Sequence, residues 1–324
     1  MHRSPFPRIA AGTAALALAL AACSSDNESS EDSSAAGYPL TVDNCGEELV
    51  IESEPQTVMT IGTSAIALLD AAGASDRIIA RAGEFGSELP QGLEQPPSDA
   101  EIVDPADPTA EKIIGAGADI VVGYGLFNAA PEDLEAVGTP NVVIEGECNH
   151  DEAAVAPIDF DAVFADIERL GRIFGTEEAA RTSVEEMRAA MSELESDVPA
   201  ERRSAAVVYY FSAAASMSAR GGLSISSDIL DRAGLDDVYG DEQAAYLEAS
   251  FETLLDADPE IVVLAYGLYG ESFEEAREQF LSEPGADDLQ AVRDGLLIGV
   301  PASDLYADPG ALRGLRAVLE GSAT

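Results

Sequence analysis

The chain has few basic residues. Of its 324 residues, 17 are Lys or Arg and 61 are Asp or Glu, so the formal net charge is −44. A surface of that sign repels the phosphate backbones of DNA and RNA as well as anionic lipid headgroups. Nucleic-acid binding is therefore excluded. We interpret the charge as a well-solvated surface rather than as the sign of an acidic substrate.

Common catalytic motifs are also missing. The sequence contains no G-x-S-x-G, no G-x-x-x-x-G-K-[ST], no H-E-x-x-H and no G-x-G-x-x-G after its first strand. It has two histidines, and only His150 lies downstream of the N-terminal leader described next. A secreted enzyme with a histidine base would have to use His150, which lies in an acidic loop. A metal-ion binder that depends on clustered histidines is disfavoured for the same reason. A purely structural surface protein is a third alternative.

The N-terminus predicts export. Two arginines and no acidic residue precede a 14-residue apolar run that ends at Cys23, which is too short to span a bilayer as a mature helix. The run "LAAC" (20–23) resembles the lipobox of bacterial lipoproteins, in which the cysteine is lipidated and becomes the first mature residue. An ordinary signal peptide is the alternative. Cleavage before Cys23 would leave a net charge near −46, and residues 24–37 have no large apolar side chain, which predicts a flexible tether.

Two further cysteines remain, Cys45 and Cys148. Outside the membrane an even pair is most simply a disulfide, which would join the start of the folded region to the end of its first half. The alternative is a metal site around "ECNHDE" (147–152), which contains a single histidine.

Apolar strands alternate with helical segments on both sides of a long helical stretch. Continuous apolar strands between helices predict parallel sheets covered on both faces. Between the two alternating regions, apolar residues recur every three or four positions from 159 to 196, with a break at Gly175-Thr176 where Thr176 is the expected N-cap. The second of these helices, about 177–196, predicts a stiff spacer. The expected boundaries are a signal peptide (1–22), a lipidated cysteine with its tether (23–37), a first α/β lobe (38–158), a helical linker (159–200) and a second α/β lobe (201–324).

One helix-into-strand unit occurs twice. "EKIIGAGADIVV" (111–122) and "ETLLDADPEIVV" (252–263) share an opening Glu, an acidic residue eight positions later and the same Ile-Val-Val, at a constant offset of 141. The duplicated unit predicts two similar lobes.

In this order and after a lipobox, these segments resemble the lipid-anchored substrate-binding proteins of ABC importers for iron–siderophores, haem and cobalamin. The resemblance covers residues 38–324, with marks such as "GGLSISSDILDRAGLDDV" and "LQAVRDGLLIGVPASDLYADPGALRGLRAVL". It implies two doubly wound, Rossmann-like lobes bridged by one long helix, the class III arrangement of periplasmic binding proteins. It also implies a non-enzymatic, monomeric protein that hands a small-molecule iron chelate to a permease dimer, with no metal bound directly by protein side chains and the N-terminal lipid as its only covalent group.

The resemblance assigns a role to the duplicated glutamates. In this family one Glu on each lobe docks on a permease subunit, and the matching positions are Glu111 and Glu252. Thr109 and Ser250 precede them as expected N-caps, so a carboxylate that merely stabilises the helix N-terminus is the structural alternative.

In open α/β sheets, ligands bind beyond the carboxyl ends of the strands. The residues after the predicted strands are rich in aromatic side chains, which suit a bulky, partly apolar ligand such as a ferric siderophore, with haem or cobalamin as alternatives. Arg81 and Arg220 are candidates for an oxyanion of the ligand, although each could instead form an ion pair within its lobe. Any single tyrosine could equally belong to the core. The candidate ligand-binding residues are Ser64, Arg81, Phe85, Tyr124, Phe127, Tyr210, Phe211, Met217, Arg220, Tyr246, Tyr266 and Tyr269.

Overall fold

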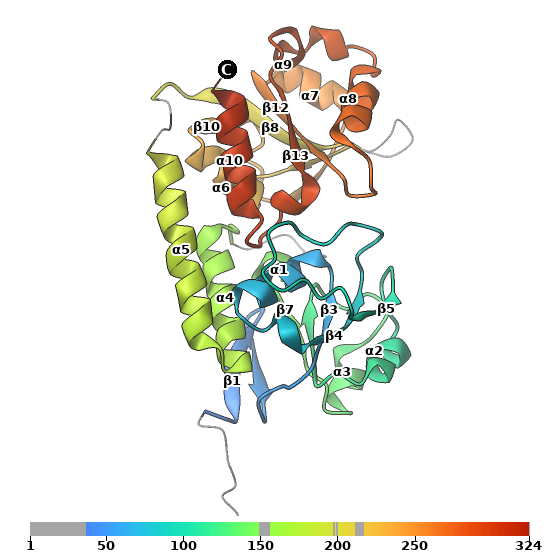
Figure 1. The fold of residues 1–324 in the computed structure, drawn as a ribbon. Coiled ribbons are helices and arrows are strands. Elements are labelled where there is room, and N and C mark those ends of the chain that lie inside the picture. Colours follow the sequence, from blue (N-terminus) through green and yellow to red (C-terminus); the bar gives the residue numbers. More distant parts are fainter. Residues whose placement is uncertain (1–36, 149–155, 197, 199, 211–216, 324) are drawn as a thin grey trace, which may run out of the picture. The chain divides into compact units, whose positions relative to one another are not determined.

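The computed structural model describes residues 37–148, 156–196, 198, 200–210 and 217–323 (Figure 1). The predicted signal peptide, Cys23 and most of the tether lie outside these residues, as do His150 and Phe211. None of the helices in the described part is both long enough and apolar enough to cross a membrane.

The first lobe is built on a five-stranded sheet with all its strands parallel. The sheet order is β5-β4-β3-β6-β7. Alternate residues of the buried strands pack on opposite faces. The helix α1 and the linker helices cover one face, and α2 and α3 cover the other. The strands are β3 (Val58–Ile61), β4 (Ile78–Ala82), β5 (Glu101–Asp104), β6 (Ile120–Gly123) and β7 (Asn141–Val143), and the helices are α1 (Thr63–Ala71), α2 (Ala110–Ala116) and α3 (Pro131–Glu135).

The second lobe has a six-stranded sheet of mixed direction. Its order is β11-β9-β8-β12-β13, with β10 also paired to β8. The strands β10, β12 and β13 are parallel to their neighbours, whereas β9 and β11 are antiparallel. The sequence pattern predicts strands over 205–211, 260–266 and 296–301, which correspond to β8, β12 and β13, and it misses the short strands β9, β10 and β11. The strands are β8 (Arg203–Tyr209), β9 (Met217–Arg220), β10 (Leu235–Asp237), β11 (Tyr246–Ala249), β12 (Ile261–Tyr266) and β13 (Leu297–Pro301).

Helices cover this second sheet on both faces as well. Two of them, α6 (Ile225–Arg232) and α10 (Ala311–Ser322), pack on the face shared with the linker helices. The opposite face packs against α7 (Phe251–Ala257), α8 (Phe273–Leu281) and α9 (Gln290–Arg293). Each lobe is therefore doubly wound, as predicted.

The linker consists of two helices, α4 (Phe160–Phe174) and α5 (Glu177–Glu195), packed side by side (Figure 1). The predicted break is confirmed, because Gly175 adopts a left-handed conformation with φ 67°. Thr176 is the N-cap residue of α5, but its side chain accepts no hydrogen bond from the helix amides; its hydroxyl instead donates to the carbonyl of Ala72, at 2.6 Å. At ~1.5 Å per residue, the 19-residue α5 is roughly 28 Å long.

Both linker helices touch both lobes. At the start of α4, the amide of Phe160 donates to Asp228 of α6 in the second lobe. Tyr38, which lies near the start of the first lobe, donates from its hydroxyl to the carbonyl of Ile173 at the other end of α4. Near the end of α5, Glu195 pairs with Arg232 at 2.7 Å. The helix α5 is thus the predicted spacer, and α4 runs back along it as a second one.

The hairpin of β1 (Leu40–Asn44) and β2 (Glu47–Ile51) is fastened to the first lobe. Its turn residue Cys45 forms a disulfide with Cys148, with the Cα atoms 5.1 Å apart, as the cysteine pair predicted. The buried Arg169 of α4 donates to the carbonyls of Asp43 and Val143, at 2.7 and 2.6 Å, and pairs with Asp166. Burial raises the pKa of Asp166 to about 6, although Arg169 opposes the shift. One cation thus ties the hairpin and β7 to the linker.

The duplicated unit has a structural role in each lobe. Asp119 accepts hydrogen bonds from the amides of Gln56 and Thr57 at the start of β3, at 2.8 and 2.9 Å. Glu260 accepts one from the amide of Ser204 in β8, at 3.0 Å, and its own amide donates to the Ser204 hydroxyl. The acidic residue before each Ile-Val-Val therefore fixes its strand beside the central strand of its sheet.

Candidate ligand-binding cleft

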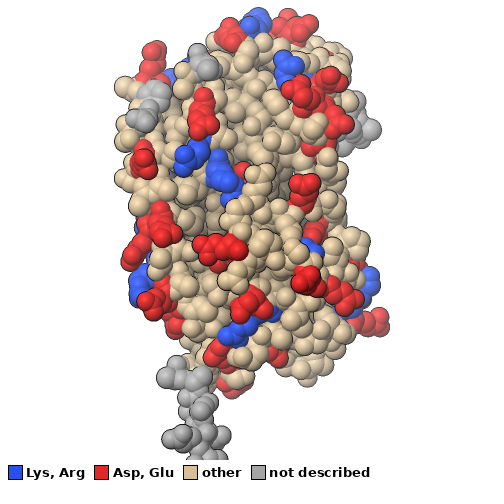
Figure 2. Space-filling model, viewed as in Figure 1, with Lys and Arg blue, Asp and Glu red and all other residues tan. Residues whose placement is uncertain are grey.

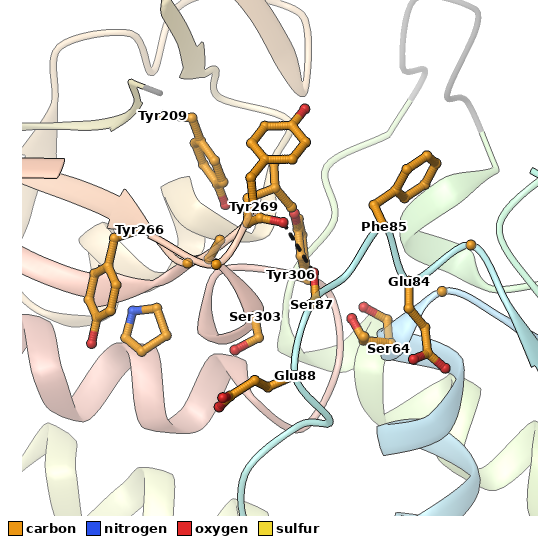
Figure 3. A pocket seen from close by; sticks show the side chains of 18 of the residues that line it. Ser64, Glu84, Phe85, Ser87, Glu88, Tyr209, Tyr266, Tyr269, Ser303 and Tyr306 are labelled. Atoms are coloured by element: carbon orange, nitrogen blue, oxygen red, sulfur yellow. Dashed lines mark hydrogen bonds between the residues drawn. The ribbon is translucent and has the colours of Figure 1, made fainter. Parts of the chain in front are cut away.

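A cavity of about 820 Å³ lies between the two lobes (Figure 3). Its first-lobe wall comes from the segments after β3, β4, β5, β6 and β7. Its second-lobe wall comes from the end of β8, from the segments that begin at the ends of β12 and β13, and from β9 and β11. The carboxyl ends of the parallel strands of both sheets therefore meet at one site, as the fold class predicts.

Aromatic side chains dominate the cavity wall. Eight of the lining residues are Tyr or Phe, contributed by both lobes. Phe85, Phe127 and Tyr269 are 47 %, 42 % and 65 % exposed, so they form the outer part of the wall, whereas Tyr209 is fully buried. This gradient gives an apolar surface for a ligand that enters from solvent. The eight are Phe85, Tyr124, Phe127, Tyr209, Tyr246, Tyr266, Tyr269 and Tyr306.

Arg220 is the one basic residue among the described residues that line the cavity, and it is buried. Its guanidinium carbon lies 3.9 Å from the ring centre of Tyr209 and 4.2 Å from that of Tyr246, so the cation is held between two aromatic faces. Burial lowers its pKa, but the neighbouring tyrosines, Tyr209 foremost, raise it further, so the pKa lies above its usual value. None of the ion pairs between described residues includes Arg220.

Strand pairing explains this arrangement. In the antiparallel ladder of β9 and β11, Tyr246 lies directly opposite Arg220. In the ladder of β8 and β9, Tyr209 lies opposite Ser218, two residues from Arg220 and on the same face of β9. Cross-strand and diagonal neighbours are the pairs whose side chains meet on a sheet face. The antiparallel strands thus assemble the Arg220 site.

The cavity wall carries an excess of negative charge. Its acidic residues are Glu84, Glu88, Asp107, Glu147, Glu271 and Glu275. Figure 2 shows Asp and Glu side chains spread over both lobes on the face viewed, with fewer basic ones.

Most of these carboxylates have partners within the protein. Glu84 pairs with the buried Arg81 at 3.1 Å, and burial raises the pKa of Glu84 against the effect of that pair. Asp107 accepts a hydrogen bond of 2.7 Å from the Tyr124 hydroxyl.

Two more of these carboxylates belong to the loop after β12 and the helix that follows it, and Glu147 shares a hydrogen bond with Tyr246. Glu271 accepts from the amides of Gly267 and Tyr269, at 2.8 and 3.0 Å, which fixes the loop that carries Tyr269. Glu275 closes the capping box of α8 with Ser272.

The lobes also touch each other directly at the edges of the cavity. The Ser87 hydroxyl donates to the carbonyl of Leu268 at 3.2 Å (Figure 3). Ser64, at the start of α1, donates to Asp308 of the second lobe. Asp308 is buried and also accepts from the amide of Gly310, at 2.6 Å. Burial raises the pKa of Asp308 to about 7, while the Ser64 hydrogen bond opposes the shift.

The structure brings together eight of the residues predicted to bind ligand. They come from both lobes and lie in one wall: Ser64, Phe85, Tyr124, Phe127, Arg220, Tyr246, Tyr266 and Tyr269.

Three predicted residues do not line the cavity, and a fourth, Phe211, lies outside the described residues. Arg81 is buried in its ion pair with Glu84, the alternative that the sequence left open. Tyr210 and Met217 pack in the core on the α7–α8 face of the second sheet, where the Tyr210 hydroxyl bonds Glu283. The assignment of Tyr210 to the cleft is wrong by one residue, because side chains alternate across a strand and Tyr209 faces the cavity instead.

Sequence reasoning missed Tyr209, Tyr306 and the acidic part of the wall. Strand alternation along β8 could have separated Tyr209 from Tyr210. Tyr306 follows β13 after one turn of 3₁₀ helix, and the ring centres of Tyr306 and Tyr209 lie 6.5 Å apart. The position of a residue after a strand could have identified Tyr306, as it did Tyr124.

The two duplicated glutamates lie outside the cavity. Glu111 is in the first turn of α2 and Glu252 in the first turn of α7, and both are exposed. Ser250 caps α7 with its side chain, whereas Thr109 makes no such bond to α2. The two carboxylates hold equivalent positions on the two lobes.

No group of three or more His, Cys, Asp or Glu side chains within the described residues is placed to hold a metal ion.

Several solved structures have this fold. A crystal structure described as an ABC-type Fe³⁺-hydroxamate transport system from Saccharomonospora viridis is 26 % identical, has a TM-score of 0.76, and covers 89 % of this chain and 100 % of its own. The haem-binding protein HutB of Vibrio cholerae is 16 % identical with a TM-score of 0.64 (82 % of this chain, 98 % of its own). The vitamin B12-binding protein BtuF of Vibrio cholerae is 17 % identical with a TM-score of 0.59 (83 % and 96 %).

The last two show the fold alone. No curated protein matches the chain. The family model described as "Periplasmic binding protein" matches residues 58–303, a span that includes both sheets and most of the cavity wall. The chain therefore belongs to the periplasmic binding protein family.

Proposed function

We propose that this protein is the extracytoplasmic substrate-binding lipoprotein of an ABC importer, and that it captures an iron–siderophore complex in the cavity between its lobes. The observation that carries the proposal is the buried Arg220, which lies between Tyr209 and Tyr246 with no ion-pair partner among the described residues. A buried cation without an anionic partner is costly, and an anionic group of a ligand would provide that partner.

The rest of the wall suits the organic shell of a ferric chelate. A cavity of about 820 Å³ is within the usual range for small-molecule sites. The aromatic faces offer apolar contact, while Arg220 donates to the oxygen atoms that chelate the iron. The solved structure from Saccharomonospora viridis, 26 % identical over its whole chain, is described as an Fe³⁺-hydroxamate transport system, which supports this choice of ligand over haem or cobalamin.

A thermal-shift panel on residues 38–324 tests the ligand. Hydroxamate, catecholate and carboxylate ferric chelates, haem and cobalamin are each added in excess. A true ligand stabilises the protein by RT ln(1 + [L]/Kd), which is about 2.7 kcal/mol at one hundred times Kd. We expect a ferric siderophore to give the largest shift. A larger shift with haem or cobalamin would make that molecule the proposed ligand instead of a siderophore. No shift with any of them would overturn the proposal.

Binding without turnover is part of the proposal, because proteins of this family bind substrates rather than transform them. Mass spectrometry of the ligand released from the protein should return the ligand unchanged. A chemically altered product that His150→Ala no longer forms would instead support an enzyme.

The anchor is proposed at Cys23, on the outer face of the cell membrane. Lipidated Cys23 would hold the folded protein through its tether. We expect the wild-type full chain to fractionate with membranes and to incorporate labelled fatty acid. The Cys23→Ser variant should take up no label and appear in the soluble fraction. A soluble, unlabelled wild-type protein would rule out the lipid.

Docking on the permease dimer is proposed at Glu111 and Glu252. Equivalent exposed glutamates on two similar lobes suit a partner with two-fold symmetry. Reversal of both charges with Glu111→Lys and Glu252→Lys should abolish uptake by cells and leave ligand affinity unchanged. The matched control is Glu132→Lys with Glu274→Lys, which reverses the charge of first-turn glutamates of α3 and α8, one in each lobe. Equal uptake by the two double variants would show that Glu111 and Glu252 have no specific role in docking.

A further inference from the structure

The charges around the cavity discriminate between classes of ferric chelate. Among the described residues, six acidic side chains and one basic side chain line it, a formal charge of −5. The ion pair of Arg81 with Glu84 offsets one of the negative charges without adding a free cation to the wall. A ligand therefore meets one local positive site, at Arg220, inside a surface that is otherwise negative.

The positive charge of Arg220 and the negative charge of Glu88 lie on different lobes. Arg220 is on β9 of the second lobe, deep between aromatic rings. Glu88 is on the loop after β4 of the first lobe, is exposed, and lies in the cavity wall (Figure 3). Asp107, Glu271 and Glu275 accept hydrogen bonds from neighbouring groups, whereas the Glu88 carboxylate has no hydrogen bond or ion pair with a described residue. Its charge is therefore available to a ligand.

We propose that the cavity selects ferric chelates whose net charge is zero or positive, held with their chelating oxygen atoms at Arg220 and a cationic arm near Glu88. This inference rests on the proposed function and narrows its ligand class. Neutral ferric trishydroxamates, in particular those with a terminal amine, fit this distribution of charge. Ferric triscatecholates carry a large negative charge, and so they would meet repulsion from most of the wall, because complementary charge sets specificity between partners.

A matched set of ligands tests the inference without changing the iron coordination. The probe is a ferric linear trishydroxamate with a free terminal amine, compared with the same chelate after acetylation and after succinylation of that amine. The three carry net charges of +1, 0 and −1 at neutral pH. We expect affinity to fall in that order, with the amine form binding roughly tenfold or more tighter than the succinyl form. The difference should shrink as salt is raised, since part of the wall is open to solvent.

Glu88→Gln links the preference to one side chain. Because Glu88 is exposed, its removal should weaken the amine form by only about two- to fivefold and leave the acetylated form unchanged. Glu94→Gln is the control: it removes the same charge from the same loop, on an exposed residue that does not line the cavity. Equal effects of the two substitutions would overturn the role of Glu88.

The outcomes separate the inference from the proposed function. If the succinyl form or a ferric triscatecholate binds as tightly as the amine form, the charge selection is wrong while siderophore capture stands. If none of the ferric chelates binds, the proposed function fails first, and the inference fails with it.

Discussion

The two lobes share one arrangement of strands and helices but differ in how they contribute to the cavity. Each has a central parallel strand, a helix that begins near a duplicated glutamate, and an acidic residue that fixes the following strand. The first lobe keeps all five strands parallel, and its arginine near the cavity, Arg81, is paired with Glu84. In the second lobe two antiparallel strands place Arg220 beside two tyrosines with no ion pair. The departure from the duplicated pattern creates the site.

The lobes also differ in how they are held together, which gives the largest expected effect. The first lobe is closed by a disulfide that joins residues 103 positions apart. The second lobe contains no cysteine. Replacing the two bonded cysteines, with Cys45→Ser and Cys148→Ser, should lower the free energy of unfolding by about 2–5 kcal/mol, measured by urea denaturation.

Hydrogen exchange locates that loss. We expect amides of β3 and β6 to lose more protection than those of β8 and β12. A reductant should leave the double variant unchanged and destabilise the wild type. Equal losses in both sheets would show that the disulfide does not act on the first lobe in particular.

The contrast between the two arginines gives the next effect. Arg220→Ala should weaken ligand binding by about a hundredfold, because it removes a buried, charge-assisted donor, and Arg220→Lys should recover only part of it. The comparison is Arg81→Met with Glu84→Gln, which removes the first-lobe pair together and should change the dissociation constant by less than about threefold. Titration calorimetry measures all three variants. A larger effect from the first-lobe pair would reverse the assignment.

Asp308 tests the contact between the lobes by pH. Its native pKa of about 7 lies above its ordinary value because of burial, so the native state keeps the proton where the unfolded chain has lost it. The resulting stability is complete below about pH 4 and declines as the pH rises towards 7.

Asp308→Asn cannot ionise and should lack that decline. Relative to wild type, the variant should gain about 4 kcal/mol between pH 4 and pH 8 in urea denaturation, because the native pKa lies about three units above its ordinary value and each unit is worth roughly 1.4 kcal/mol. The exposed Asp287→Asn serves as the control, with no such trend expected. A difference that is flat with pH, or that runs the other way, would mean that Asp308 is ionised in the native state.

The smallest effect separates the faces of β8. Tyr209→Phe removes a hydroxyl on the cavity face and should weaken ligand binding by about two- to fivefold. Tyr210→Phe removes one that bonds Glu283 on the other face and should leave affinity unchanged. The reverse order in a binding titration would place Tyr210 in the site after all.

Sequence reasoning reached the lobes and the spacer because both depend on local apolar patterns, and it reached the disulfide because an exported pair of cysteines has one simple partner choice. Apolar periodicity marks β3, β6, β8 and β12, and the repeat places two of them in equivalent positions. The strands β9 and β11 escaped it because they are short and only partly apolar, and because strand direction depends on which distant strand they pair with.

The residues of the candidate site were also predictable only where they depend on local sequence patterns. Residues directly after a predicted strand, such as Tyr124 and Tyr266, were found, since the fold brings strand ends together. The partner of each arginine could not be read in advance, because Arg81 pairs locally with Glu84 whereas Arg220 meets Tyr246 only through the β9–β11 register. The acidic residues of the wall could not be singled out from the sequence, because acidic residues are in excess along the whole chain.

A crystal structure of residues 38–324 with a ferric trishydroxamate tests the central claim most directly. We expect difference density for one chelate in the 820 Å³ cavity, in contact with Arg220 of the second lobe and with the loop after β4 of the first. Density on the outer surface, or in contact with one lobe only, would contradict the account.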